Sequence, residues 1–584
     1  MTPGVLLERA LTLHRAGQLA EAAGLYAQVL RQVPADWRVH LSLGGALLAL
    51  GRDREALASF DAALSLHSDC VEAHHGRGMA LQRLQQFQAA LQAFDAALAL
   101  QPDSAELCNS RGNALRRLQR LPEALSSYER SLALQPALVA AHNNRGLVLQ
   151  ALGRLPEAAQ SYERAVALQP RAAEILGNLG AVQCELGEPA AALATCRRAL
   201  QLQPGMRGVR GNLGNALRDL QRPEEALAQY ELALEEAPQD ATGYCHRGNA
   251  LFDLKRIDEA IASYDRAIAL SPSHAQAHFN KGLCLLLRGD FAQGLPLYEW
   301  RRQLLGGEAP AHGGTPWLGE QPLAGRTLLV YADQALGDTI QFCRYVPLLQ
   351  AQRAHVVLAV QPQLRELLGG LSTTARIVAI DAIDQPCDYH CALASLPLAL
   401  RTTLASVPAA VPYLSAQASR IEHWRASLGE AGLKIGIAWQ GSRNRIGLGR
   451  SVPLEMFARL AAIPGVRLIC LQKGEALEEL RRVRANVPAE IPAAPFDEGP
   501  QAFLDSAALM SALDLIITCD TALAHLAGAL GRPTWIALKQ VPDWRWLLEG
   551  TDCPWYPTAR LFRQPRLGDW ESVFTAIHAE LARP

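Results

Sequence analysis

One aspartate stands where a short apolar run gives way to a helix-like stretch. Residues 327–332 are apolar and β-rich, and the sequence DQALGD follows them, ending at Asp338. Gly337 permits a tight turn, so Asp338 would stand where a helix begins. A carboxylate there is able to accept the proton of a hydroxyl as a general base. With Gln341 three positions later, the same aspartate also fits a helix-capping role that involves no chemistry.

A second run has the composition of a phosphate-binding helix start. Residues 519–533 read CDTALAHLAGALGRP and follow a strongly apolar stretch that we expect to be a strand. Free N–H groups and the positive end of the helix dipole would bind a diphosphate, and small residues would let it come near. Asp520, the second residue of this run, is a further candidate for the ligand site. His525 lies one turn into the helix, where it fits either a ligand contact or a core histidine bonded to a backbone carbonyl.

Other polar residues gather at expected strand ends of the same region. Residues 434–442 read KIGIAWQGS, a buried strand that ends in Gly441 and Ser442, where backbone N–H groups become accessible to a phosphate. Further candidates for the same ligand site are Arg450, Ser451, Gln472, Lys473, Lys539 and Asp543, and Arg545 is another charged site candidate. For Arg450 and Lys473 the alternative is solvated surface charge. The aromatic residues between 544 and 562 would form a platform for a ring or pack inside the last lobe.

A cysteine pair suggests metal ligands at first sight. Residues 387–391 read CDYHC, but no second pair has zinc-site spacing, so we interpret the stretch as core. The sequence also lacks P-loop, GxSxG and HExxH patterns. We therefore expect neither a metal nor another cofactor.

These candidates need a frame of strands and helices to position them. From about residue 326, short β-rich runs alternate with helical stretches, as in βαβ units with a parallel sheet. Strands are expected at 327–332, 355–360, 376–380, 434–439, 467–471, 513–518 and 534–538. Prolines near 406–412 divide the region into lobes at 326–412 and 413–584, with a ligand cleft between them. Residues 304–325 form a linker, and the last helix, near 570–581, would cross back to the first lobe.

The first half of the chain repeats with a period of 34 residues. Glycine recurs from Gly44 to Gly282 in steps of 34, and an aromatic residue (once Cys196) stands 16 positions after each. Small residues let two helices approach, while the aromatic fills the gap to the next pair. Each pair cannot bury its apolar face alone, so neighbours stack into a superhelix. The pattern resembles the tetratricopeptide repeat, and we assign residues 1–303 to eight repeats and a closing helix.

By this resemblance, one register of polar residues lines the concave face of the array. Side-chain amides there would grip a peptide backbone without reading its sequence, since each offers donors and an acceptor. The peptide-binding candidates are Asn144, Asn178, Asn212, His246 and Asn280. The alternative is that asparagine is simply common at this position, whatever the repeats bind.

Composition sets broad limits on the kind of protein. Of 584 residues, 49% are hydrophobic and 19% are charged, which is typical of a globular chain. The net charge of −1 gives no reason to expect a nucleic-acid partner. No signal peptide or membrane-spanning run is visible, and twelve scattered cysteines suit a reducing compartment. We therefore expect a cytoplasmic protein.

The second half resembles a heptosyltransferase-like domain, which covers residues 316–584. The resemblance is carried by LGDTI at 336–340, followed by Arg344, and by the run at 519–533. It implies an α-solenoid followed by a two-lobed α/β domain of the GT-B type, inverting and independent of metal. It makes Asp338 the base and Thr521, Ala522 and Leu523 the diphosphate contacts. O-GlcNAc transferases and bacterial flagellin glycosyltransferases are similar in plan.

The resemblance predicts a bacterial protein glycosyltransferase that uses a nucleotide-diphosphate sugar and modifies Ser or Thr of a polypeptide on the repeats. Three departures weaken individual assignments: a short first lobe, Asp333 and Ala335 in place of Glu and Gly, and Lys539 at a usually apolar position. Two alternatives stay open. One is a binding scaffold with a decayed transferase domain, and the other is a glycolipid heptosyltransferase with a docking array.

Overall fold

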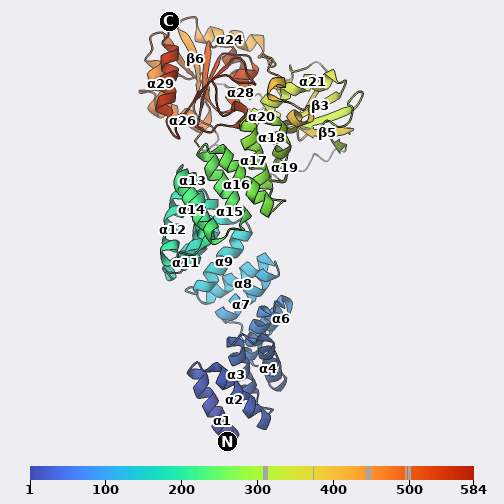
Figure 1. Ribbon diagram of the computed structural model, residues 1–584, viewed down its shortest axis with the longest axis vertical. Coiled ribbons are helices and arrows are strands. Elements are labelled where there is room, and N and C mark those ends of the chain that lie inside the picture. Colours follow the sequence, from blue (N-terminus) through green and yellow to red (C-terminus); the bar gives the residue numbers. More distant parts are fainter. Residues whose placement is uncertain are drawn as a thin grey trace. The chain divides into compact units, whose positions relative to one another are not determined.

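Figure 1 shows the computed structural model of the protein, which describes residues 1–304, 306, 314–372, 374–441, 449–493, 496–497 and 502–583. The chain forms two compact units, Met1–Ala216 and Leu217–Pro584. The boundary falls inside the array predicted for residues 1–303, so its last repeats belong to the same unit as the two sheets. None of the described helices has both the length and the apolar character needed to cross a membrane.

The first unit is an α-solenoid of helix pairs. Each odd-numbered helix packs against the helix that follows it, and that helix packs against the next pair. The helices are α1 (Pro3–Arg15), α2 (Leu19–Gln32), α3 (Trp37–Ala49), α4 (Asp53–Leu66), α5 (Val71–Arg83), α6 (Phe87–Leu100), α7 (Ala105–Arg117), α8 (Leu121–Leu134), α9 (Val139–Ala151), α10 (Leu155–Leu168), α11 (Ala173–Glu185) and α12 (Pro189–Leu202). Helix α13 (Arg207–Asp219) spans the boundary between the units.

Contacts between glycine and aromatic residues explain the period of the array. A Cβ atom on Gly44 would lie 2.7 Å from the Phe60 ring, and one on Gly78 would lie 2.5 Å from Phe94. Phe60 also faces Gly76 of the next pair, where a Cβ would lie 2.4 Å away. The aromatic ring therefore fills the space between two successive pairs, as the sequence predicted, and only glycine leaves room for it.

The second unit begins with the end of the array. Its helices are α14 (Pro223–Glu236), α15 (Ala241–Asp253), α16 (Ile257–Leu270), α17 (Ala275–Leu287), α18 (Phe291–Tyr298) and the short α19 (Arg301–Leu304). Helix α17 packs on α18 and α19, and it also contacts the second lobe. The end of the solenoid is thus joined to the lobes by direct packing.

A parallel sheet forms the first lobe, with strand order β1-β5-β2-β3-β4. Its strands are β1 (Thr315–Pro316), β2 (Thr327–Tyr331), β3 (His355–Val360), β4 (Arg376–Ala379) and β5 (Tyr389–Ala392), and its helices include α20 (Leu336–Phe342), α21 (Val346–Ala351), α22 (Arg365–Leu368) and α23 (Leu396–Ala399). Strand β1 lies within the predicted linker at 304–325, and Trp317 after it is buried. The last part of that linker therefore belongs to the lobe.

The second lobe is built on another parallel sheet, with order β11-β10-β9-β6-β7-β8. Its strands are β6 (Leu433–Ala438), β7 (Val466–Cys470), β8 (Ala489–Glu490), β9 (Leu515–Cys519), β10 (Thr534–Leu538) and β11 (Ala559–Arg563), and its helices include α24 (Ala418–Leu428), α25 (Ala458–Ala461), α26 (Gly474–Val483), α27 (Leu504–Ser511), α28 (Ala522–Ala529) and α29 (Trp570–Leu581). These apolar strands are buried, as expected when helices cover both faces of a parallel sheet.

The last helix does not cross back to the first lobe, so that expectation was wrong. Helix α29 places Trp570, Val573, Phe574 and Ile577 in the core of the second lobe. The ring of Phe574 packs edge to face on Phe457, with 4.8 Å between the centroids. These apolar residues at helical spacing form one stripe, which is buried against the nearest sheet.

The cysteines are distributed through both units as free thiols. None of the twelve forms a disulfide, and eleven of them are buried. Burial raises the pKa of Cys196 and of Cys245 to about 12, which keeps both as neutral thiols.

Candidate functional site

Asp338 lies in the first turn of α20. The helix begins at Leu336, two residues earlier than the sequence predicted, because the backbone of Ala335 is extended and serves as the N-cap. Asp338 Oδ2 accepts a hydrogen bond from Ala335 N at 3.1 Å, so the carboxylate does cap the helix, from its third residue. Its other oxygen, Oδ1, accepts from Arg545 Nη2.

A chain of alternating charges runs from Asp338 into the second lobe. Arg545, on the short 3-10 helix η8 (Trp544–Trp546), also donates from Nη1 to Asp543 Oδ1 at 2.8 Å. The other oxygen of Asp543 lies 3.5 Å from Arg450 Nη2. Arg450 Nε in turn lies 3.4 Å from Asp520 Oδ2. Three predicted nucleotide-sugar residues thus stand in one network with the predicted base.

The two carboxylates nearest to Arg545 differ in their affinity for protons. Burial raises the pKa of Asp338, and the attraction of Arg545 offsets this only in part. Burial also raises the pKa of Asp543, but Arg545 and Arg450 outweigh it and bring the value to about 2. Environments that push two acids apart in this way assign them different roles. Asp338 is the one that suits proton transfer.

The first turn of α28 lies against the first turn of α20. A Cβ on Gly337 would lie 3.2 Å from Ala522 Cα and 3.0 Å from His525 Cδ2, so glycine is what lets the two helices meet. Thr521, the N-cap of α28, and the next two residues are half-buried. The N–H groups of a first helical turn lack partners within their own helix. The predicted phosphate-binding turn therefore begins beside the helix of Asp338.

Gly441 lies close to the N-cap of that turn. A Cβ on Gly441 would find its nearest neighbours at 3.8 Å, among them Thr521 Cγ2 and Arg450 Cβ. Gly441 N donates to Ser451 Oγ at 3.2 Å. The structure thus gathers Gly441, Arg450, Ser451, Asp520 and Thr521. Ser442 lies outside the described residues.

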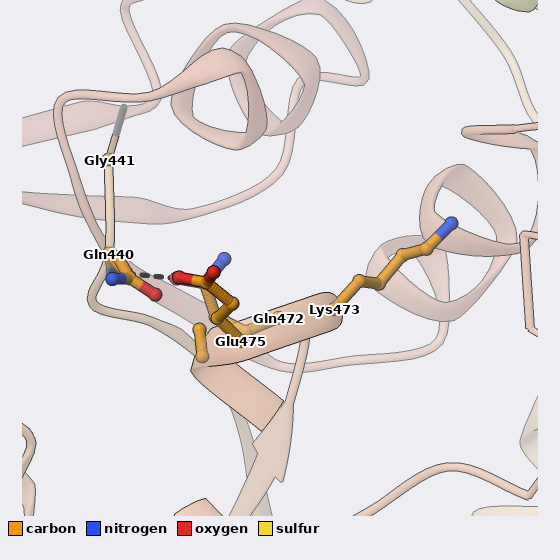
Figure 2. A pocket seen from close by; sticks show the side chains of 6 residues that line it. Gln440, Gly441, Gln472, Lys473 and Glu475 are labelled. Atoms are coloured by element: carbon orange, nitrogen blue, oxygen red, sulfur yellow. Dashed lines mark hydrogen bonds between the residues drawn. The ribbon is translucent and has the colours of Figure 1, made fainter. Parts of the chain in front are cut away.

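A small cavity of about 240 Å³ opens next to Gly441 at the ends of β6 and β7. Gln472, a predicted site residue, lines it and accepts from Gln440 N at 2.6 Å (Figure 2). Lys473 extends away from Gln472 and Glu475, and its Nζ donates to Asp497 O at 2.5 Å. A larger hollow of about 530 Å³ lies beside Gln440 and is lined by Trp439, Gln440, Ser451, Val452, Pro453, Glu479, Arg482 and Val483.

Sequence profiles of two kinds match different parts of the chain. Tetratricopeptide-repeat profiles match residues 7–72, 75–139, 143–207, 185–244 and 248–289. The profile of glycosyltransferase family 9 (heptosyltransferase) matches residues 457–538, which run from η6 (Leu454–Phe457) to the end of β10. The chain thus carries tetratricopeptide repeats across its N-terminal region and a match to glycosyltransferase family 9 in its second half.

Similar proteins are found among curated sequences and among solved structures. Protein FlbA of Caulobacter vibrioides is 29% identical over 323 residues, which cover 51% of this chain and 53% of FlbA. The match therefore spans about half the length of this curated relative. Among solved structures, YrrB, described as a repeat protein with an unusual peptide-binding site, is 25% identical with a TM-score of 0.29 and covers 32% of this chain and 96% of its own. A repeat protein from Parabacteroides merdae is 18% identical with a TM-score of 0.35, covering 43% and 98%.

His525 in the family 9 region has the surroundings of a core histidine. It is buried, its Nδ1 lies 3.0 Å from Tyr556 Oη, and its ring stacks on Trp546 at 5.1 Å. Burial and the charge of Arg545 lower its pKa to about 3, so the ring is neutral near pH 7. These contacts fit the core histidine that the sequence allowed, except that its partner is the phenol of Tyr556 rather than a backbone carbonyl.

Lys539 directly follows β10 and lies near Arg450 of the charge network. Its Cδ lies 3.8 Å from the Cβ position of Gly449, next to Arg450. Burial and the charge of Arg450 lower the pKa of Lys539. Lys539, directly after the residues that the family 9 profile matches, thus adds a second basic side chain near Arg450.

Arg344, noted in the sequence only as part of a motif, joins the two lobes. It is 4% exposed and donates to the backbone oxygens of Pro408 and Trp555 at 3.1 and 2.6 Å and to Tyr413 Oη at 3.0 Å. Its guanidinium also lies over the Tyr556 ring, 4.5 Å from the centroid. A single charge in the apolar run FCRYV was the available signal for a buried, fully partnered arginine.

In the first unit, the predicted peptide-binding amides pair with amides of the preceding repeat. Asn144 Nδ2 donates to Asn109 Oδ1 at 3.0 Å, and Asn178 Nδ2 donates to Asn143 Oδ1 at 3.1 Å. Asn212 is half-buried, and its backbone oxygen accepts from Cys184 Sγ at 3.4 Å. The pairing partners were missed because they occupy the neighbouring register, one position earlier in each repeat.

The second unit carries the remaining two candidates. His246 is half-buried beside the ring of Tyr230, 5.5 Å between centroids. Asn280 Nδ2 donates to Asn249 Oδ1 at 2.6 Å and its own oxygen accepts from Gln276. Each candidate amide thus keeps part of its surface and part of its hydrogen-bonding capacity.

Both cysteines of the stretch at 387–391 are buried in the first lobe. Cys387 lies two residues before β5 and Cys391 lies within it, and their thiols donate to the backbone oxygens of Gln385 and Ala392. Among the described residues, no group of His, Cys, Asp and Glu side chains has the arrangement of a metal site.

Proposed function

We propose that the protein transfers a sugar from a nucleotide-diphosphate donor to a Ser or Thr hydroxyl of a polypeptide held by the repeats. The observation that carries the proposal is the contact of α20 with α28. The first turn of α20, which carries Asp338 with its raised pKa, packs there against the helix start that suits a diphosphate. An acid beside an anion site is the minimum that transfer from such a donor requires.

The donor would lie on the Gly441 side of α28, because α20 covers the other side. Its diphosphate would accept from the N–H groups at Thr521, Ala522 and Leu523, with Arg450 and Lys539 supplying positive charge. The cavity next to Gly441 suits the nucleoside part. Positive charge fixed at that place would stabilise the diphosphate as it leaves, so the protein itself would do the work of a metal.

The transfer would be a single displacement. Asp338 takes the proton of the acceptor hydroxyl while its oxygen forms a bond to the anomeric carbon. The bond from that carbon to the diphosphate oxygen breaks on the opposite face, and the nucleoside diphosphate leaves with the electron pair. The configuration at the anomeric carbon is therefore inverted. The half-buried amides of the repeats would hold the acceptor backbone without reading its sequence.

The bond between Arg545 and Asp338 favours a second candidate function. An aspartate permanently held by arginine would not accept a proton, and the protein would then be a binding scaffold. The repeats alone would carry that function.

The test is a panel of nucleotide-diphosphate sugars, assayed by thermal shift and by release of nucleoside diphosphate. We expect one donor to stabilise the protein and to be turned over, with sugar adducts on cellular proteins detected by mass spectrometry. Asp338→Asn should abolish turnover while Asp381→Asn, an exposed aspartate of the same lobe, should not. If no donor binds, the scaffold function replaces the transferase. If Asp338→Asn modifies proteins as the natural chain does, the base is another group.

A further inference from the structure

The loop that leads to Asp338 is hydrogen-bonded by side chains from outside its own lobe. Residues 332–335 join β2 to α20, and two side chains from the end of the repeat array reach them. These are Tyr298, the last residue of α18, and Arg301, the first of α19. Both are buried, with exposed fractions of 3% and 1%.

Arg301 is fully occupied in holding Asp333 and its surroundings. Its Nε and Nη2 donate to Asp333 Oδ2 at 3.1 and 2.9 Å, and Nη2 also donates to Ser395 Oγ at 2.7 Å. Nη1 donates to Glu299 Oε1 at 2.5 Å. The second oxygen of Asp333 accepts from Ala394 N at 3.2 Å. A buried arginine with two carboxylates fixes geometry because every donor has a set partner.

Tyr298 holds the next residue of the loop. Its hydroxyl accepts from Gln334 Nε2 at 2.8 Å and lies 3.1 Å from Gln334 Oε1. Gln334 O accepts from Gln361 Nε2 at 2.8 Å, and Gln361 Oε1 accepts from Thr339 Oγ1 inside α20 at 2.9 Å. The chain of hydrogen bonds therefore runs from the repeats through the loop into the helix of Asp338.

The hydrogen bonds from Arg301 to Asp333 and between Tyr298 and Gln334, which we call the clamp, lead to the Asp338 carboxylate. Asp333 and Gln334 are held from the repeats, and the next residue, Ala335, gives its N–H to Asp338 Oδ2. A shift of the loop would move this N–H and with it the carboxylate. We propose that Tyr298 and Arg301 are positioning residues for Asp338, so that the last repeat forms part of the transferase site. This rests on the proposed function, and it makes the rate of transfer sensitive to the state of the repeats.

The sharpest test compares two tyrosines that occupy the same register of the repeat. Tyr298→Phe removes one hydroxyl from the clamp and keeps the ring against Trp544. Tyr128→Phe is the matched control, because the Tyr128 hydroxyl donates to Asn113 Oδ1 at 2.8 Å, within the first unit. We expect hydrogen exchange in the peptide over 332–340 to rise about fivefold in Tyr298→Phe, as loss of one neutral hydrogen bond predicts. Tyr128→Phe should leave it unchanged.

Activity gives the second measurement. We expect kcat for transfer to fall about 10- to 100-fold in Tyr298→Phe with the donor KM unchanged, since a misplacement of about 1 Å can cause such a loss. Arg301→Lys should retain more activity than Arg301→Met, because it keeps the charge beside Asp333. Equal exchange and equal kcat in the two tyrosine variants would overturn the positioning role. If exchange rises but the natural chain turns over no donor, the transferase is refuted while the clamp stands.

Discussion

The carboxylate of Asp338 is shared between a helix N–H and a guanidinium, and yet its pKa is raised. The physical reason is burial, which disfavours the charged form more than Arg545 favours it. Asp543 experiences the same arginine and a second one, Arg450, and its pKa is lowered instead. One arginine therefore stands between an acid suited to exchanging a proton and an acid that stays charged.

This difference predicts the acid limb of the pH–rate profile. A general base must be deprotonated, so transfer should fall as the pH drops through the raised pKa of Asp338. We expect the acid limb of kcat/KM to lie above pH 3.8, the ordinary value for aspartate. Asp338→Asn should be about 10²- to 10⁴-fold slower and should lack this limb. A limb at or below 3.8 would assign the base to another group.

The same shift links Asp338 to stability. Because its folded pKa lies above the unfolded value, its stabilising contribution is present below the unfolded pKa and is lost as the pH rises through the folded pKa. Relative to Asp338→Asn, the natural chain should therefore lose free energy of unfolding across that window. Denaturant titrations of both proteins at several pH values measure this difference, and parallel curves would contradict it.

At the scale of the helix, adjacent glycines of α3 have opposite roles. A Cβ on Gly44 would meet the Phe60 ring, which Gly76 confines from the other side, whereas a Cβ on Gly45 would find nothing within 4 Å. We expect Gly44→Ala to destabilise the first unit by about 1–3 kcal/mol through overpacking. Gly45→Ala should stabilise it by about 0.5–1 kcal/mol, because alanine is the better helix former. Calorimetry of the two variants decides, and a similar response in both would refute the packing explanation.

The sequence predicted strands correctly where their apolar pattern was unambiguous. The predicted strands at 355–360 and 534–538 coincide with β3 and β10, because buried parallel strands are continuous apolar runs. Strand β11 was missed because arginines interrupt its apolar residues, and β1 and β8 because two residues make no pattern. The start of α20 was placed too late because a capping aspartate at the third position resembles one at the cap.

The site was less accessible to sequence reasoning than the fold. Spacing and resemblance singled out Asp338, Asp543 and Arg450 separately, but the bond between Asp338 and Arg545 joins residues 207 positions apart. No local pattern encodes such a contact. Tyr298 and Arg301 were missed for a related reason, because the repeat register accounted for the tyrosine and a linker seemed to follow.

At the scale of the molecule, the functional boundary falls inside the repeat array. The second compact unit begins at Leu217, and it contains the repeats that hold the Asp338 loop.

A chain that begins at Arg207, with α13 intact, should fold and hydrolyse donor but modify polypeptides poorly, since Asn144 and Asn178 are absent. A chain that begins at 304 should lose donor hydrolysis as well, because Asp333 loses Arg301. Circular dichroism and nucleotide release measure both. Full hydrolysis by the shorter chain would show that the lobes are self-sufficient.

Alkylation of the buried cysteines would report the local unfolding of each part of the protein. A thiol with a raised pKa reacts slowly with an alkylating reagent until local packing is lost. Three of the buried cysteines lie in the first unit, at Cys70, Cys108 and Cys196, and eight lie in the second. The order in which peptides acquire the label would therefore report which half of the chain opens first, with no introduced probe to disturb it.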